Sequence, residues 1–250
     1  MMEGHSMMND QDNSMVHEFE EHTINLNEEK TIENFKIKVE TDSNPKINQS
    51  TQINISITKN NSLADLDIMH EKPIHLILVR EDLNNFDHIH PLLSQNNYQI
   101  DYAFKEPGNY RVWLDFTLSG EQHLINFNLS TENSENLTPR YEESNLFLQN
   151  GISVEIVKPT KIIPNTNTNL KFILKENNQT INTEKFLGAA AHLIAISNDL
   201  KSFKHTHDEE DNNGIIEMDL KFQDKEFYKL WLQFNHKNNT ITAQFIAKVE

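Results

Sequence analysis

The sequence predicts an all-β protein that consists of two tandem immunoglobulin-like antiparallel β-sandwich domains, and three observations support this prediction. Apolar residues recur at every second position in short segments, such as Ile53, Ile55 and Ile57, and this period is typical of half-buried strands. Turn-forming sequences such as Pro107-Gly108-Asn109 separate the segments, with no helical pattern between them. The pattern of the first half then returns in the second half, which indicates a duplicated unit.

The first unit is expected over residues 35–130. Phe35, Ile37 and Val39 alternate with polar residues at its start. Six or so short strands in roughly 95 residues are typical of an immunoglobulin-like sandwich. The later apolar segments of this unit are Ile74–Val79, Tyr98–Phe104, Tyr110–Thr117 and Leu124–Leu129.

The second unit is expected over residues 151–250, after a polar linker at residues 131–150. At an offset of 117 residues, His75-Leu76-Ile77 coincides with His192-Leu193-Ile194. One inserted residue then changes the offset to 118, at which Trp113 coincides with Trp231. A register that is kept over roughly 95 residues with a single insertion is strong evidence for duplication.

The composition limits the classes of partner. The chain of 250 residues carries 22 basic and 38 acidic side chains, which gives a formal net charge of −16. An acidic surface repels phosphate, which argues against nucleic acid and anionic membranes as partners and favours cations. No apolar run approaches the roughly 18 residues that a membrane helix requires, and no secretory signal is visible. The absence of cysteine removes disulfides and thiolate ligands without fixing the compartment.

Residues 1–34 are expected to form a disordered acidic tail, because they show no strand or helix periodicity and carry nine acidic residues against one basic residue. Five of the seven methionines lie within the first 15 residues of this tail. Thioether and imidazole ligands together suit copper, Cu(I) especially, so the tail is predicted to be a weaker metal-collecting segment. The alternative is that some of these methionines are start-codon residues. The tail residues predicted to bind metal are His5, Met7, Met8, Met15 and His17.

Each predicted unit carries three histidines in the same register. The first histidine lies in an apolar strand, and a His-x-His pair follows 13 residues later. In an extended strand the two residues of such a pair project from one face, roughly 6–7 Å apart, so both imidazoles can bind one ion. The spacing allows the first histidine to meet the pair across a loop, and we therefore predict one three-histidine metal site in each repeat. The predicted ligands are His75, His88 and His90 in the first repeat and His192, His205 and His207 in the second.

Ligation by imidazole alone suits Zn(II), Cu(II) or Ni(II), and the order of affinities favours copper, with zinc as the second choice. The alternative is that His-x-His is a turn motif and that the histidines are structural, since duplication by itself would also repeat them. His70, His123 and His236 have no histidine counterpart in the other repeat, and we expect them at the surface.

The segment from Ile74 to Pro91, IHLILVREDLNNFDHIHP, resembles a HLxxVRxDLxxFxHxHP pattern of poorly characterised exported bacterial proteins. In those proteins a GxYRxWxDF-like strand follows, and here it reads GNYRVWLDF at residues 108–116. The resemblance covers both repeats and implies a role in copper or heavy-metal handling without a defined activity. The second copy departs from the pattern at Ser197 and Asp208, so its site is expected to differ in affinity or in metal.

These features predict a metal-binding protein that sequesters or delivers copper and is not an enzyme. The resemblance implies an extracytoplasmic or cell-surface location, with an export signal that is absent from this sequence, although a cytoplasmic location stays open. A metal transporter or another envelope protein is the expected partner. Two alternatives remain. One is a non-catalytic protein-interaction module with structural histidines, and the other is a zinc hydrolase, since three histidines and a water describe a known catalytic site.

Overall fold

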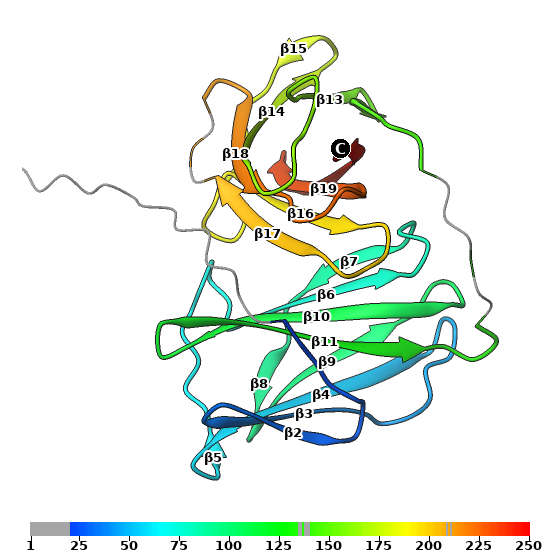
Figure 1. The fold of residues 1–250 in the computed structure, drawn as a ribbon, viewed down its shortest axis with the longest axis vertical. Helices are drawn as coiled ribbons and strands as arrows, with labels where there is room; N and C mark the ends of the chain where they lie inside the picture. The colour runs from blue at the N-terminus through cyan, green and yellow to red at the C-terminus, as the bar shows by residue number, and fades with distance from the viewer. Residues whose placement is uncertain (1–20, 135–136, 138–140, 209, 211) are drawn as a thin grey trace, which may run out of the picture.

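The computed structural model describes residues 21–134, 137, 141–208, 210 and 212–250. The predicted metal-collecting residues of the tail, from His5 to His17, lie outside the described residues. All regular elements of the described part are β-strands, and they form two sandwiches in tandem, so the predicted fold class is confirmed (Figure 1). The strands pair antiparallel except for β1 (Glu21–Thr23), which runs parallel to β11 (Glu121–Ser130). No helix in the part of the chain that is described is long and apolar enough to cross a membrane.

The first sandwich contains strands β1 to β11. One sheet has the order β1-β11-β10-β6-β7 and the other β2-β3-β4-β9-β8, with β5 paired to β4. The strand bounds are β1 Glu21–Thr23, β2 Glu29–Ile32, β3 Phe35–Thr41, β4 Ser50–Lys59, β5 Ser62–Leu63, β6 Ile74–Arg80, β7 Phe86–Ile89, β8 Leu92–Ser94, β9 Asn97–Ala103, β10 Asn109–Leu118 and β11 Glu121–Ser130.

The second sandwich contains strands β12 to β20 and repeats this arrangement. One sheet has the order β17-β16-β19-β20, and the other has β12-β13-β14-β15 with β18 paired to β14. The strand bounds are β12 Leu146–Gln149, β13 Ile152–Val157, β14 Asn167–Glu176, β15 Gln179–Thr180, β16 Ala191–Ser197, β17 Phe203–Asp208, β18 Ile215–Lys221, β19 Phe227–His236 and β20 Asn239–Lys248.

Two segments differ from the sequence-based expectation. Residues 21–34 were expected in the tail, but they form β1 and β2, and residues 131–150 were expected to be a linker, but they include β12. In the edge strand β2, Glu29 faces solvent while Ile32 is buried in the first core. The carboxylate of Glu21 accepts a hydrogen bond of 3.0 Å from Trp113 Nε1, which fixes β1 beside β11.

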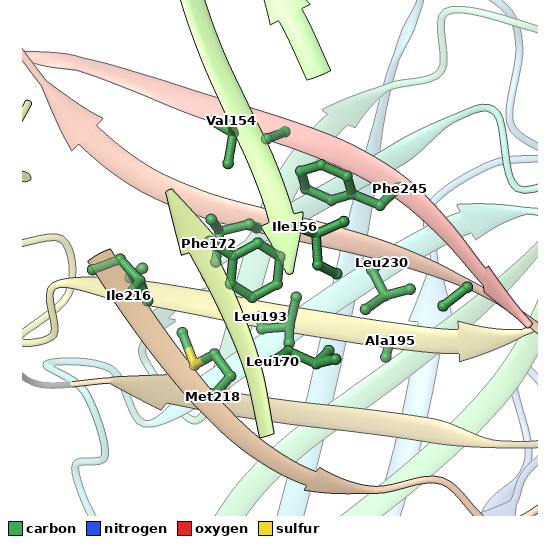
Figure 2. Packing of buried hydrophobic residues seen from close by; sticks show 14 of the residues in the cluster. Val154, Ile156, Leu170, Phe172, Leu193, Ala195, Ile216, Met218, Leu230 and Phe245 are labelled. Atoms are coloured by element: carbon green, nitrogen blue, oxygen red, sulfur yellow. The ribbon is translucent and has the colours of Figure 1, made fainter. Parts of the chain in front are cut away.

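Alternation along the strands creates the core of each sandwich. In β14 the residues Leu170, Phe172 and Leu174 are fully buried, while the residues between them are more exposed. Figure 2 shows Leu170 and Phe172 meeting side chains of the facing sheet, among them Leu193 and Phe245. Each repeat therefore has a core of its own.

The strands β6 and β16 are buried along both faces, since every residue of each strand is buried. One face, with Leu76 and Leu193 as examples, belongs to the core of its own sandwich. The other face carries Ile77 and Ile194, which belong to a third apolar cluster that joins the two repeats. Figure 1 shows β16 and β17 of the second sandwich lying over β6 and β7 of the first. We call this contact the inter-repeat interface.

Two aromatic stacks cross the inter-repeat interface in a symmetric manner. Phe86 stacks on Trp231 with ring centroids 4.5 Å apart, and its counterpart Phe203 stacks on Trp113 at 5.3 Å. Each repeat thus supplies one phenylalanine and one tryptophan to the other, as two subunits related by a two-fold axis would. The tryptophans pack between the repeats because their positions on β10 and β19 face outward from the two cores.

Truncation of one stack tests how strongly the two repeats depend on each other. Phe203 is 7% exposed, and Phe203→Ala should lower the free energy of unfolding by about 3 kcal/mol, because it leaves a cavity against Trp113. Urea unfolding followed by circular dichroism measures this loss. Leu92→Ala is the control, since Leu92 is 68% exposed and its truncation should change the free energy by less than about 0.5 kcal/mol. A loss for Phe203→Ala as small as that of the control would contradict a stabilising interface.

Candidate metal site between the repeats

The inter-repeat interface contains all six histidines that the sequence predicts as ligands. His75 and Ile77 occupy alternate positions of β6 and share its outward face, as His192 and Ile194 do on β16. The His-x-His pairs lie next to these two strands, because β7, which carries His88 and ends one residue before His90, pairs with β6, and β17 pairs with β16. The strand register therefore brings both sets of histidines to one place, where the sequence had predicted two separate sites.

The first trio, defined as His75, His88 and His90, is closely packed. One ring nitrogen of each residue lies within 4.8 Å of those of the other two. His75 Nδ1 is 2.9 Å from His88 Nε2 and 3.2 Å from His90 Nε2. Two nitrogens bound to one tetrahedral ion at about 2.0–2.1 Å lie roughly 3.3 Å apart, so this trio is close to the spacing that an ion requires.

The second trio, defined as His192, His205 and His207, is less tightly gathered. His192 Nδ1 lies 3.3 Å from His205 Nε2, whereas the ring centroids of His192 and His207 are 6.0 Å apart. The ring of His207 instead lies 3.6 Å from that of His70. The two trios are neighbours, since the ring of His205 is 5.2 Å from the rings of both His75 and His88.

Hydrogen bonds on the outer side of the rings fix which nitrogen carries the proton. His75 Nε2–H donates to the carbonyl of Met69 at 3.1 Å, which leaves Nδ1 with a lone pair. With the Gln233 amide oriented so that its Nε2 donates to Thr242, His88 Nδ1–H donates to Oε1 of Gln233 at 2.9 Å, which leaves His88 Nε2 with a lone pair. The two lone pairs therefore face each other across 2.9 Å. His90 Nε2–H can donate a hydrogen bond to His75 Nδ1. The lone pair on His88 Nε2 then still points at the centre of the trio without a donor.

The second trio repeats this pattern. His192 Nε2–H donates to the carbonyl of Phe186 at 3.0 Å, and His205 Nδ1–H donates to Oδ2 of Asp115 at 2.9 Å. The nitrogens with lone pairs, His192 Nδ1 and His205 Nε2, again face each other. Outer hydrogen bonds that orient imidazoles in this way are typical of metal-ligating histidines.

The outer partners of His88 and His205 come from the opposite repeat. Gln233 of β19 holds His88 of the first repeat, and Asp115 of β10 holds His205 of the second. Asp115 and Gln233 occupy equivalent positions at the offset of 118 residues. Both oxygens of Asp115 accept hydrogen bonds, since Gln122 Nε2 donates to Oδ1 at 2.6 Å. The two halves of the cluster are thus alike in shape and differ in one group, a carboxyl against an amide, and burial raises the pKa of the Asp115 carboxyl.

Burial keeps the imidazoles neutral. Loss of solvent is the largest cause in every case, and it lowers the pKa of His90 and His192 to about 3 and that of His207 to about 4. The pKa values of His88 and His205 are also held well below the ordinary value, because loss of solvent and the neighbouring imidazoles disfavour the charged form. Neutral imidazole is the form that binds metals.

Comparison with known proteins places the chain in a family. The profile of a domain of unknown function, DUF8832, matches residues 30–133 and again residues 148–250. The chain belongs to the DUF8832 family. The two matched segments correspond to the two sandwiches, so each sandwich is one DUF8832 domain and each supplies one histidine trio. No curated protein matches the chain in sequence.

Solved structures that resemble the tandem DUF8832 domains do so remotely. Salmonella alpha-2-macroglobulin reacted with methylamine aligns at 9% identity with a TM-score of 0.31, over 87% of this chain and 15% of the macroglobulin. The trypsin-activated Escherichia coli alpha-2-macroglobulin aligns at 7% identity with a TM-score of 0.28, over 86% and 15% of the respective chains. The D0-D1 domain of intimin aligns at 11% identity with a TM-score of 0.23, over 84% of this chain and 95% of that one. This chain therefore spans only about one seventh of the macroglobulins that it matches.

Three residues of the DUF8832 histidine cluster were not predicted from the sequence. Asp115 and Gln233 differ in type and so give no repeat signal, although each lies two residues after a tryptophan and shares its outward face. His70 was expected at the surface, but it is half-buried, because the turn that carries it lies against the second trio. Of the other two histidines expected at the surface, His123 is only 8% exposed and packs against Phe35. His236 is half-buried and forms an ion pair with Glu176 when protonated.

The lowered histidine pKa values predict that the metal-free protein loses stability in acid. Below the unfolded-state pKa of 6.5, the unfolded chain binds protons that the folded cluster excludes, so the free energy of unfolding falls as the pH falls from about 6.5 toward 4. Each such histidine contributes up to about 1.4 kcal/mol per pH unit in this window. Urea unfolding of metal-free protein at about pH 7.5, 6 and 5, on both sides of the histidine pKa of the unfolded chain, measures the loss. A free energy that stays constant over this range would show that the histidines are accessible to protons.

Proposed function

We propose that this protein binds a transition-metal ion between its two DUF8832 domains and acts in sequestration or delivery, with no catalytic step. The observation that carries the proposal is the pair of lone pairs, on His75 Nδ1 and His88 Nε2, that face each other at 2.9 Å. The outer hydrogen bonds use the single proton of each neutral ring, so no proton is left between the two nitrogens. An ion that accepts both lone pairs removes the repulsion between them.

A proton shared between the two rings is the simplest competitor, because it too would separate the lone pairs. It would make one ring an imidazolium in a site where burial already lowers the pKa of both His75 and His88. A metal ion bonds to both nitrogens and to His90 at once, so its binding energy offsets the cost of burying its charge in a way that one proton cannot.

Copper is the ion that we favour, with zinc second. All three ligands of the first trio are imidazoles, and the general order of affinities places Cu(II) above Zn(II) and Ni(II) for such ligands. The closed packing of the trio and the absence of cysteine in the whole chain suit a borderline ion bound through nitrogen. The resemblance to exported bacterial proteins supports an extracytoplasmic or cell-surface location and delivery to or from a metal transporter or another envelope protein.

Calorimetric titration of the untagged full chain with Cu(II) and with Zn(II) at neutral pH tests the proposal. Wild type should bind at least one equivalent, and His88→Ala/His90→Ala should weaken binding by more than about 100-fold, equivalent to about 2.7 kcal/mol, because two of three ligands are lost. His236→Gln is the matched control, since His236 faces Glu176 and is not part of the cluster.

Absence of binding by wild type would contradict the metal function. Together with a melting temperature that neither metal nor chelator changes, it would favour the alternative, a protein-interaction module with structural histidines. Binding that survives His88→Ala/His90→Ala unchanged would show that another part of the chain holds the ion.

A further inference from the structure

A cavity of about 100 Å³ lies beside the histidine cluster. Its wall includes His75 of the first trio, His205 and His207 of the second trio, and Asp115 between them. Met69 also lines the cavity and is 44% exposed, so the cavity extends from the buried histidines to the surface of the molecule. A hydrated cation in solvent can reach the histidines of the cavity wall through this opening, among them His205, whose side chain is only 5% exposed.

The outer wall of this cavity is a tight turn. Met69 and Lys72 exchange two backbone hydrogen bonds of 3.0 Å, and the residues between them, His70 and Glu71, have φ values of 48° and 65°. Positive φ at both central positions is the geometry of a type I′ turn, which favours Asn and Gly over His and Glu. The turn nevertheless places His70 in the cavity wall. The centroid of its ring lies 3.6 Å from the ring centroid of His207 and 5.4 Å from that of His192.

The second repeat has the same turn with different chemistry. Phe186 and Ala189 exchange the equivalent backbone hydrogen bonds, and Leu187 and Gly188 occupy the central positions. At the offset of 117 residues, Phe186 replaces Met69 and Leu187 replaces His70. The two turns meet at the interface, because an added Cβ on Gly188 would lie 3.9–4.0 Å from atoms of Glu71 and His70. Metal-binding side chains are therefore present on one of the two related turns only.

We propose that this cavity is a loading port, in which Met69 and His70 capture a soft or borderline cation and pass it by way of His207 to the first trio. The inference rests on the proposed metal function. Thioether and imidazole bind copper ions and release them readily when only one or two ligands are engaged. His207 Nδ1 is buried and has no hydrogen-bond partner among the described residues, so it can bind an ion without breaking an existing contact. Asp115 in the cavity wall adds an acidic group that attracts cations.

Stopped-flow loading of metal-free full chain with Cu(II) tests the port. Trp113 and Trp231 lie at the inter-repeat interface, so quenching of their fluorescence by bound Cu(II) reports arrival of the ion. Met69→Phe/His70→Leu gives the first turn the side chains of the second turn. Both association and dissociation should slow by at least about ten-fold in this variant, while the affinity changes far less than either rate. His70→Asn should slow association as well. Because Asn tolerates a positive φ, this single variant tests the port even if the double variant misfolds.

His236→Gln is the control and should load at the rate of wild type, because His236 is not part of the cavity wall. An association rate that is the same in wild type and in both turn variants would overturn the port. A loss of affinity with an unchanged association rate would also overturn it, since His70 would then be a permanent ligand. If wild type binds no metal in calorimetry, the proposed function itself fails, and this outcome is distinct from the two above.

Discussion

The structure depends on burial of two strands, β6 and β16, on both of their faces. An antiparallel sandwich usually exposes the outer face of each sheet, but here the outer faces of the two repeats cover each other and form a third apolar cluster. The crossed stacks of Phe86 on Trp231 and of Phe203 on Trp113 belong to this contact. The histidines share these faces, so the same packing that joins the repeats removes the imidazoles from water and gathers them in one cluster.

Hydrogen bonds from the opposite repeat join the two histidine trios into one cluster. His88 is oriented by Gln233 and His205 by Asp115, so each histidine trio is completed by a side chain from the other DUF8832 domain. Duplication supplied two similar halves, and the differences between them, Asp115 against Gln233 and His70 against Leu187, make the centre asymmetric. A buried carboxylate and a cavity lie on the same side of the cluster, so its two sides are not equivalent.

The fold and the two histidine trios were accessible from the sequence because both depend on local patterns. Period-two alternation marked the strands, and repetition of His75, His88 and His90 at a fixed offset separated them from isolated histidines. The merging of the two trios was not accessible, because it depends on which sheet of each sandwich faces the other. The strand β1 was missed for a related reason, since its order comes from pairing with β11 and from the bond between Glu21 and Trp113, while its own composition resembles a disordered tail.

The central claim is that the two closest imidazole nitrogens of the first trio both carry lone pairs in the metal-free protein. Nitrogen-15 NMR of histidine-labelled protein reports directly which ring nitrogen of His75 and His88 is protonated. The hydrogen bonds to Met69 and Gln233 predict the Nε2–H tautomer for His75 and the Nδ1–H tautomer for His88, with both free nitrogens shifting when Zn(II) is added. A proton on either of the two facing nitrogens that zinc does not displace would contradict the account.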